Sequence, residues 1–241
     1  MKVKNRFLSF LSISGFLLMA SSSFGQKLTT KEFMEKFNFN QCFTGTFDKL
    51  IEEINPKGNS LNEKIKSDLN NKQPLIMIEG ERAYPSPCNL HKFELKSGKY
   101  SLELISLGNM AGLKKTIMIP LIKVYSKQGE LTENIKVAKY ETRSPTYTLP
   151  FHIYSSWEFE IDKNDIYYIQ VTSDNSSDSN LSLDETSEQT VISTGAAMTT
   201  GSPIVTGAGI LTTMLLKGYP VKRSPFGKYK INLEQYKSEN Q

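Results

Sequence analysis

The stretch Trp157-Glu-Phe-Glu-Ile-Asp-Lys-Asn-Asp-Ile-Tyr-Tyr-Ile-Gln-Val171 decides the fold. Trp157, Phe159 and Ile161 alternate with charged residues, which is the period-two pattern of a strand that buries one face. A polar turn over residues 162–165 leads into a second alternating run that ends at Val171. The segment therefore predicts two consecutive strands, each with one apolar face.

Similar short runs recur along the chain from Gln73 onward, with polar and glycine-containing turns between them. They cover residues 75–78, 93–95, 100–104, 117–125, 135–137, 147–154 and 229–233. Pro120 interrupts one run, which indicates an edge or a bulge there. Strands with one apolar face must bury those faces against a second sheet. We therefore predict a mainly β domain over residues 73–241, an antiparallel jelly-roll-like β-sandwich with an insertion at about 175–225.

The preceding segment, residues 26–72, has a helical period instead and predicts three short helices. Thr29-x-x-Glu32 has the pattern of a capping box, and Thr46 is placed to cap a helix with Phe47, Leu50, Ile51 and Ile54 on one face. Ser60-x-x-Glu63 opens the third, with Leu61, Ile65 and Leu69 on one side. Isolated helices of this length are marginal, so we expect them to pack against the sandwich.

Residues 1–25 have the layout of a cleavable signal peptide. Three basic residues precede an uncharged, mostly apolar run over 7–20, and Ser23 and Gly25 offer small side chains before a cut at Gln26. The apolar run is short for a membrane span. We predict an exported protein, located in the periplasm, on the outer cell surface or in the medium.

Cleavage also changes the charge of the chain. The full sequence has a formal net charge of +4, and the predicted leader removes Lys2, Lys4 and Arg6, which leaves +1. Recognition of nucleic acid needs a larger or clustered basic excess. Nucleic acid is therefore excluded as the predicted partner.

The two cysteines, Cys42 and Cys88, follow the leader in a chain predicted to reach an oxidising compartment. One disulfide between them is the economical interpretation, with two buried thiols as the alternative.

Several of the strand runs resemble the bacterial pre-peptidase C-terminal domain. Segments 93–104, 121–129, 157–171 and 227–233 are similar to its first strands, its central strand and glycine turn, its late hairpin and its closing strand. The chain departs from the pattern at Asp165-Ile166, where the family has glycine, and by about 50 residues between the last two segments. The resemblance implies an accessory, non-catalytic module of exported proteins.

The sequence predicts no catalytic residues. Its only histidines are His91 and His152, one before a predicted strand and one within a strand. Serine-hydrolase, zinc-peptidase and phosphate-loop motifs do not occur. Glu158 and Glu160 share a strand face and resemble an acid–base pair, but the alternation places them opposite Trp157 on the solvated side.

A polar segment over 174–185 approaches the spacing of a calcium loop. Asp174, Asp178 and Glu185 fall at positions one, five and twelve, but Ser179 replaces the glycine at position six. We expect no resident cofactor and keep calcium at these three residues as a weak alternative.

Residues 189–216 form a tract without a charged side chain, rich in glycine and threonine. It is predicted to pack into the sandwich, with a membrane-touching hairpin or a transmembrane helix as alternatives. We therefore predict an exported, non-catalytic binding or scaffold protein for a protein or polysaccharide partner. The alternative is a membrane-associated protein that makes its membrane contact through 189–216, and an unrecognised hydrolase ranks third.

Overall fold

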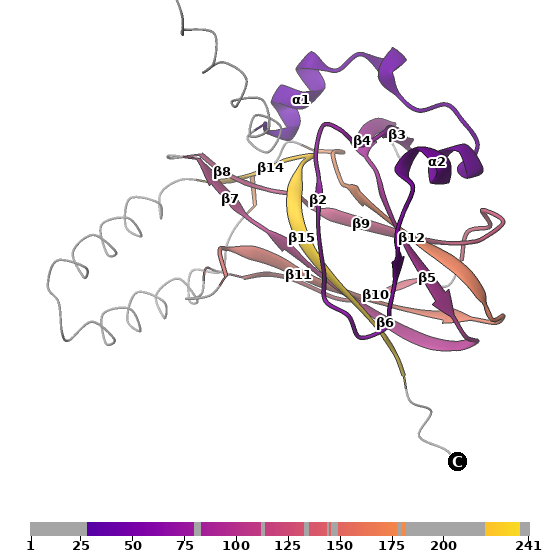
Figure 1. Ribbon diagram of the computed structural model, residues 1–241. Coiled ribbons are helices and arrows are strands. Elements are labelled where there is room, and N and C mark those ends of the chain that lie inside the picture. The colour runs from indigo at the N-terminus through magenta and orange to yellow at the C-terminus, as the bar shows by residue number, and fades with distance from the viewer. Residues whose placement is uncertain are drawn as a thin grey trace, which may run out of the picture.

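The computed structural model describes residues 28–79, 83–111, 114–132, 135–143, 145, 149–177, 180–181 and 220–236 of the chain. Two larger sheets face each other and form a β-sandwich (Figure 1). The five-stranded sheet has the order β10 (Lys136–Arg143), β11 (His152–Ile161), β6 (Gly98–Leu107), β15 (Gly227–Gln235) and β2 (Ile65–Leu69). The four-stranded sheet has the order β1 (Gly58–Asn59), β5 (Asn89–Leu95), β12 (Asp165–Ser173) and β9 (Pro120–Ser126).

Neighbouring strands in these two sheets are antiparallel except β1 and β5. The predicted fold class, an antiparallel β-sandwich with a short helical segment before it, is therefore confirmed. The stretch 157–171 forms β11 and β12, as expected, but the two strands lie in opposite sheets. The family resemblance implied a hairpin here, and that detail is wrong because the turn after Ile161 crosses from one layer to the other.

The core lies between the two sheets and follows the alternation in the sequence. Side chains from both layers share one buried cluster, and the most completely buried include Leu102, Leu104, Ile169, Ile231 and Leu233. The intervening residues of β11, Glu158 and Glu160, are exposed. Full burial of one large apolar side chain contributes roughly 1.5–3 kcal/mol, so this shared layer dominates the stability of the fold.

Two smaller sheets cover one end of the sandwich. One has the order β13 (Asn180–Leu181), β14 (Val221–Arg223), β8 (Lys114–Ile117) and β7 (Asn109–Ala111), and the other pairs β3 (Leu75–Ile78) with β4 (Tyr84–Pro87). Pro120 begins β9, so the predicted interruption at this proline separates β8 from β9.

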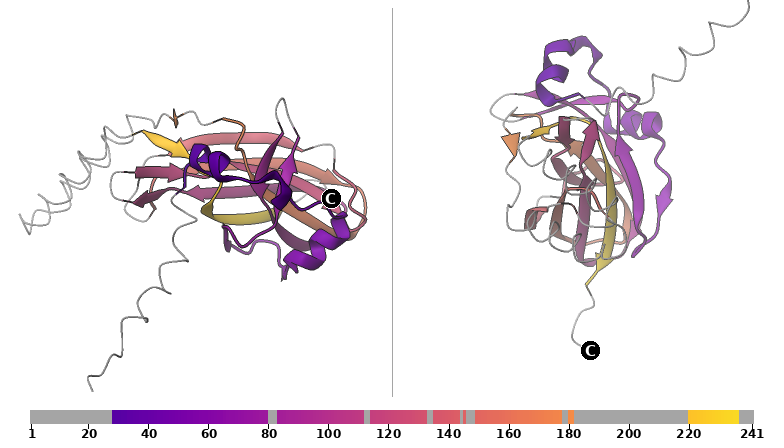
Figure 2. Two further views of the ribbon diagram at one scale, coloured as in Figure 1. Left: turned by 90° about the horizontal axis from the view of Figure 1, so that it is seen from above. Right: turned by 90° about the vertical axis from the view of Figure 1, so that its left-hand side faces the viewer.

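Two of the three predicted helices form, and both lie outside the strand layers (Figure 2). Helix α1 (Thr30–Lys36) begins with the predicted capping box, in which Thr29 and Glu32 satisfy each other's backbone N–H groups. Helix α2 (Phe47–Ile54) packs its predicted apolar face on the outer side of the four-stranded sheet, where Leu50 contacts a cluster with Leu90 and Tyr168. A short 3-10 helix (Phe39–Gln41) lies between them.

The third predicted helix is wrong, because its residues form β2 at the edge of the five-stranded sheet. Asn62 adopts a left-handed conformation, with φ at 61°, and donates its backbone N–H to Leu233 O at 2.9 Å. Ile65 and Leu69 are four residues apart, a spacing that fits one face of a helix and one face of a strand equally well. Pairing with β15 satisfies the backbone and buries Leu69 completely, so the strand is formed.

The predicted disulfide is also contradicted, because Cys42 and Cys88 are both free thiols. Strand β3 lies between them: Cys42 pairs with Leu75 on one side, and Pro87, next to Cys88, pairs with Leu75 on the other. Two strand spacings amount to about 10 Å, whereas a disulfide needs Cα atoms within about 7 Å. The alternative of two buried thiols fits better, although only Cys88 is fully buried.

This arrangement predicts a specific alkylation pattern. Burial raises the pKa of the Cys88 thiol to about 12 despite the hydrogen bond from Gln170, so it should resist iodoacetamide in the folded protein. Unfolding in urea without any reductant should expose both thiols, and mass spectrometry should then find two added groups. Alkylation that requires prior reduction would show that the cysteines are bonded.

Candidate binding cleft

The two histidines have structural partners. His91 is buried between the sheets, with its Nε2 atom 2.7 Å from the hydroxyl of Tyr229. Asn89 donates to the same hydroxyl at 3.1 Å and to Ser67 Oγ at 2.9 Å. Burial lowers the pKa of His91 to about 4, so the ring is neutral at ordinary pH. This network links β5 with β15 and β2 across the sandwich.

His152 is likewise buried, and its Nδ1 atom lies 2.9 Å from Pro150 O. The carboxyl pair Glu158 and Glu160 stands on the exposed face of β11, as the alternation indicated. Glu158 accepts a hydrogen bond of 2.7 Å from the hydroxyl of Tyr236. These contacts bring no histidine and carboxylate together into a catalytic arrangement within the described part of the chain.

Asp174, the first residue of the candidate calcium loop, is engaged by protein groups. Its Oδ2 atom forms an ion pair of 3.1 Å with Arg223, and its Oδ1 atom accepts the backbone N–H of Ser176 at 2.9 Å. Burial raises the pKa of Asp174, but the Ser176 hydrogen bonds and the Arg223 charge outweigh that effect and hold it below its usual range. Asp178 and Glu185 lie outside the described residues, so the calcium hypothesis stays a prediction.

The uncharged tract 189–216 also lies outside the described residues, so its packed and membrane-facing alternatives both stay open. Within the described ranges, no helix has the length and apolar character needed to cross a membrane.

A cleft of about 550 Å³ opens where α1 meets the end of the sandwich. Helix α1 provides one wall with Thr30, Lys31, Met34 and Glu35, and the facing wall consists of Ala83, Tyr84, Asn175, Ser176 and Ser177. Its size is within the range of cavities that hold drug-sized ligands or short peptide segments. Figure 1 shows α1 above β14 and to the left of β4.

Asn175 holds the walls together. Its side-chain amide donates to Pro85 O at 2.9 Å, and its Oδ1 atom accepts from Thr30 Oγ1 at 3.5 Å and from Ser173 Oγ at 3.3 Å. A single buried side chain therefore ties α1, β4 and β12 to one another. Buried polar groups with their partners satisfied favour one fixed arrangement.

Helix α1 has further anchors on the same end of the sandwich. Glu32 forms an ion pair of 2.6 Å with Lys114, and the hydroxyl of Ser224 donates to Leu28 O at 2.8 Å. The rings of Phe33 and Phe226 meet edge to face with centroids 5.5 Å apart. The Lys114 and Thr29 hydrogen bonds lower the pKa of Glu32 to about 2. The helix that forms one wall is thus fixed before any ligand arrives.

The cleft offers contacts of three kinds. Met34, Ala83 and the ring of Tyr84 are its apolar part, while the exposed side chains of Lys31 and Glu35 bring one charge of each sign. Burial, together with the neighbouring Asp174 carboxylate, raises the pKa of Tyr84 to about 12, so its hydroxyl stays protonated. Apolar surface and charges of both signs are therefore brought together in one cleft.

Only part of this site was predicted from the sequence. The sequence pattern predicted the capping box that starts α1 and singled out Asp174, the neighbour of Asn175, although for metal binding. It missed Asn175, whose contact with Thr30 spans 145 residues of sequence. A polar loop residue carries no signal of a partner that far away, and a period-two or helical pattern cannot reveal one.

The chain was compared with family models, curated proteins and solved structures, and a match was found among the solved structures. No family model matches the chain, and no curated protein matches its sequence. The structure matches the crystal structure of the pre-peptidase C-terminal domain of collagenase from Bacillus anthracis. The match covers 74% of this chain and 96% of that one, with 12% sequence identity and a TM-score of 0.26. The chain thus resembles this domain weakly, and the match says nothing about a ligand.

The buried His91 predicts a pH-dependent stability. The unfolded chain protonates this ring below pH about 6.5, whereas the folded protein does so only near pH 4. The unfolded state therefore binds more protons in this window, and stability falls as the pH drops through it, by about 3 kcal/mol in all. Urea titrations at pH 7 and pH 4 should show the loss, and His91→Gln should remove most of the difference. An equal loss in the variant would contradict the assignment.

Proposed function

We propose that the protein is exported, has no catalytic activity, and binds a peptide segment of another exported protein in the cleft beside α1. The leader-like pattern of residues 1–25 supports export. The engagement of His91 and His152 by structural partners supports a binding role over catalysis.

The observation that carries the proposal is a pre-formed cleft that combines apolar surface with charges of both signs. Asn175 joins its two walls, so little ordering of the protein would oppose binding. Met34 supplies an adaptable thioether surface, which suits side chains of different shapes. Lys31 and Glu35 can pair with charged groups that peptides carry and neutral sugars lack. A peptide therefore fits the lining better than a neutral polysaccharide does.

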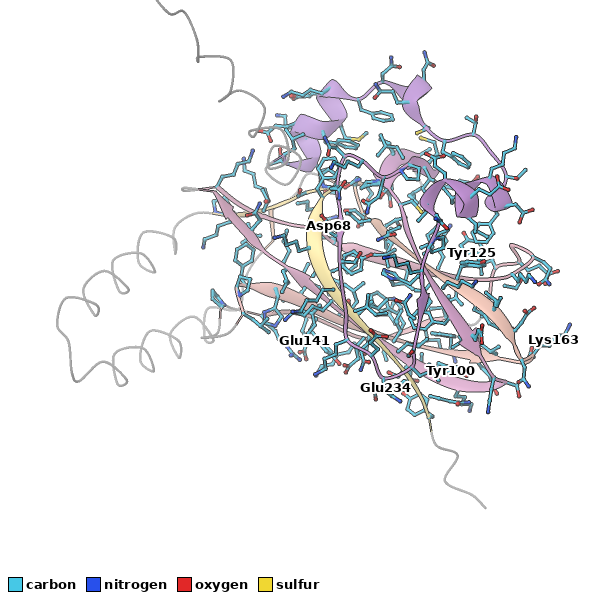
Figure 3. The ribbon with its side chains drawn as sticks, viewed as in Figure 1. Asp68, Tyr100, Tyr125, Glu141, Lys163 and Glu234 are labelled. Carbon is cyan, nitrogen blue, oxygen red and sulfur yellow. The ribbon has the colours of Figure 1, made fainter. Side chains whose placement is uncertain are left out.

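The binding part of the proposal is tested with the mature protein and a phage library of random peptides. Selected peptides should bind the wild type in calorimetry, and Ala83→Trp should weaken them roughly tenfold or more, equivalent to about 1.4 kcal/mol, because the new ring occupies the cleft. Lys163→Trp is the matched control, since that residue lies on an exposed turn away from both helices (Figure 3).

Two results would overturn the peptide proposal. One is a failure to select any peptide while the protein is retained on insoluble cell-wall polysaccharide. The other is selected peptides that bind Ala83→Trp and wild type equally. The melting temperatures of both tryptophan variants should match that of the wild type if Ala83→Trp only fills the cleft, and a lowered value would indicate a damaged fold.

Export is tested separately on the protein recovered from the cells that make it. We expect mass spectrometry to find an N-terminus at Gln26, or its pyroglutamate form, because residues 1–25 end in small side chains that fit the cleavage position. A product outside the cytoplasm that retains Met1 would contradict cleavage.

A further inference from the structure

Strand β10 is an unusually exposed edge. Among the described strands it pairs only with β11, and its residues from Lys136 to Tyr140 are all exposed. Val137 is 63% exposed and Tyr140 is 44% exposed, which makes them two of the four large apolar side chains exposed in the described parts of the chain. Both lie on the side of the sheet that faces the core, since Val137 pairs with Trp157 and Tyr140 with Ser155. The opposite layer therefore leaves the side chains of Val137 and Tyr140 partly uncovered.

Strand β10 has features that disfavour pairing with unrelated strands. Lys136 and Lys139 place positive charges on it, and a bulge interrupts the ladder between Val137 and Lys139. Charged residues and bulges are common means of blunting an exposed strand. Glu141, two residues beyond Lys139, makes the charge pattern complementary to itself.

Two antiparallel registers of β10 with a second β10 place opposite charges face to face. A two-fold axis at Thr142 sets each Glu141 opposite the Arg143 of the other copy, but it leaves the two exposed Tyr140 rings apart. When the two-fold axis passes through Tyr140, each Lys139 faces the Glu141 of the other copy, and the two tyrosine rings meet. Moving the axis to Lys139 places lysine against lysine. Moving it to Glu141 places glutamate against glutamate. Like charges directly opposite destabilise a strand pair, which excludes the registers at Lys139 and Glu141. Of the registers that pair opposite charges, only the one at Tyr140 also joins the exposed tyrosine rings.

The charged side chains of β10 are paired within the strand and partly exposed, and Lys139 and Arg143 also lie over the ring of Tyr154. Glu141 now bonds to Lys139 at 2.9 Å and to Arg143 at 2.7 Å within the same strand, and these side chains are between 39% and 50% exposed. Exposed ion pairs contribute little on their own, so exchanging them for cross-strand pairs costs little. Glu141 lies on the part of the sandwich away from α1 and α2, so the helices leave this side open (Figure 3).

We propose that two copies of the chain associate through antiparallel pairing of β10 about Tyr140, which joins their five-stranded sheets into one. The contact buries the exposed tyrosine rings and adds a strand to the β10 edge of the five-stranded sheet. It uses none of the residues that line the cleft.

The decisive experiment measures the mass of the mature protein by size exclusion with light scattering over a range of concentrations. We expect a dimer for the wild type. Lys139→Glu and Glu141→Lys should each raise the dimer dissociation constant roughly tenfold or more, since both create like-charge pairs. The double variant Lys139→Glu with Glu141→Lys should restore it. Tyr140→Lys should also dissociate the dimer, while the matched control Tyr236→Lys, at a tyrosine 46% exposed elsewhere, should not.

Cross-linking tests the register independently of stability. Tyr140→Cys places two thiols opposite each other on the axis and should give a covalent dimer on mild oxidation, whereas Val137→Cys, at a more exposed site off the axis, should not. A wild type that is monomeric at every concentration would overturn the proposal. So would a dimer that is unaffected by both single charge reversals, or one cross-linked equally at both cysteine positions.

Discussion

The constraint on which the structure depends is the burial of two apolar sheet faces against each other. Each sheet brings alternating side chains to the shared layer, and Leu102, Ile169 and Ile231 are fully buried in it. Once these faces are used, other elements must pack elsewhere. Helix α2 covers the outer side of the four-stranded sheet through Leu50, and α1 closes one end. The cleft exists because α1 stands on the end of the layers rather than on a face.

Polar groups then determine how the buried layers and the end fit together. The His91–Tyr229 pair crosses the core, where an unpartnered ring nitrogen would be costly, and Asn175 joins three elements at the end. Each network satisfies polar side chains that a purely apolar interior would not contain. Their geometry fixes the relative position of the sheets and of α1, so the cleft is shaped by hydrogen bonds and the sandwich by burial.

The sequence predicted what depends on local periodicity and missed what depends on partners far along the chain. Alternation identified β6, β11, β12 and β15, and the capping box identified α1. The same reasoning failed at Ile65 and Leu69, whose spacing fits a helix and a strand alike, and only pairing with β15 decides between them. The even number of cysteines and the predicted oxidising compartment suggested a disulfide. Neither observation contains information on β3, which separates Cys42 from Cys88. The cleft could not be foreseen because Asn175 and Thr30 meet only in the folded chain.

The four edge strands of the two sheets are protected from further pairing in different ways, and β10 differs from the other three. Strand β1 has only two residues and β2 only five, which leaves little backbone to pair. The outer side of β9 is partly occupied, because Tyr125 forms a bridge with Leu131 and Val124 O accepts the N–H of Thr132. Strand β10 is longer, with eight residues, and relies on charge and a bulge instead. A short edge strand, or one with local pairing, leaves few backbone groups for any added strand. An edge protected by charged side chains rejects only strands whose charges do not match its own. An edge protected in this way remains selective for a complementary sequence, and the antiparallel copy of Lys139-Tyr-Glu141 is such a sequence.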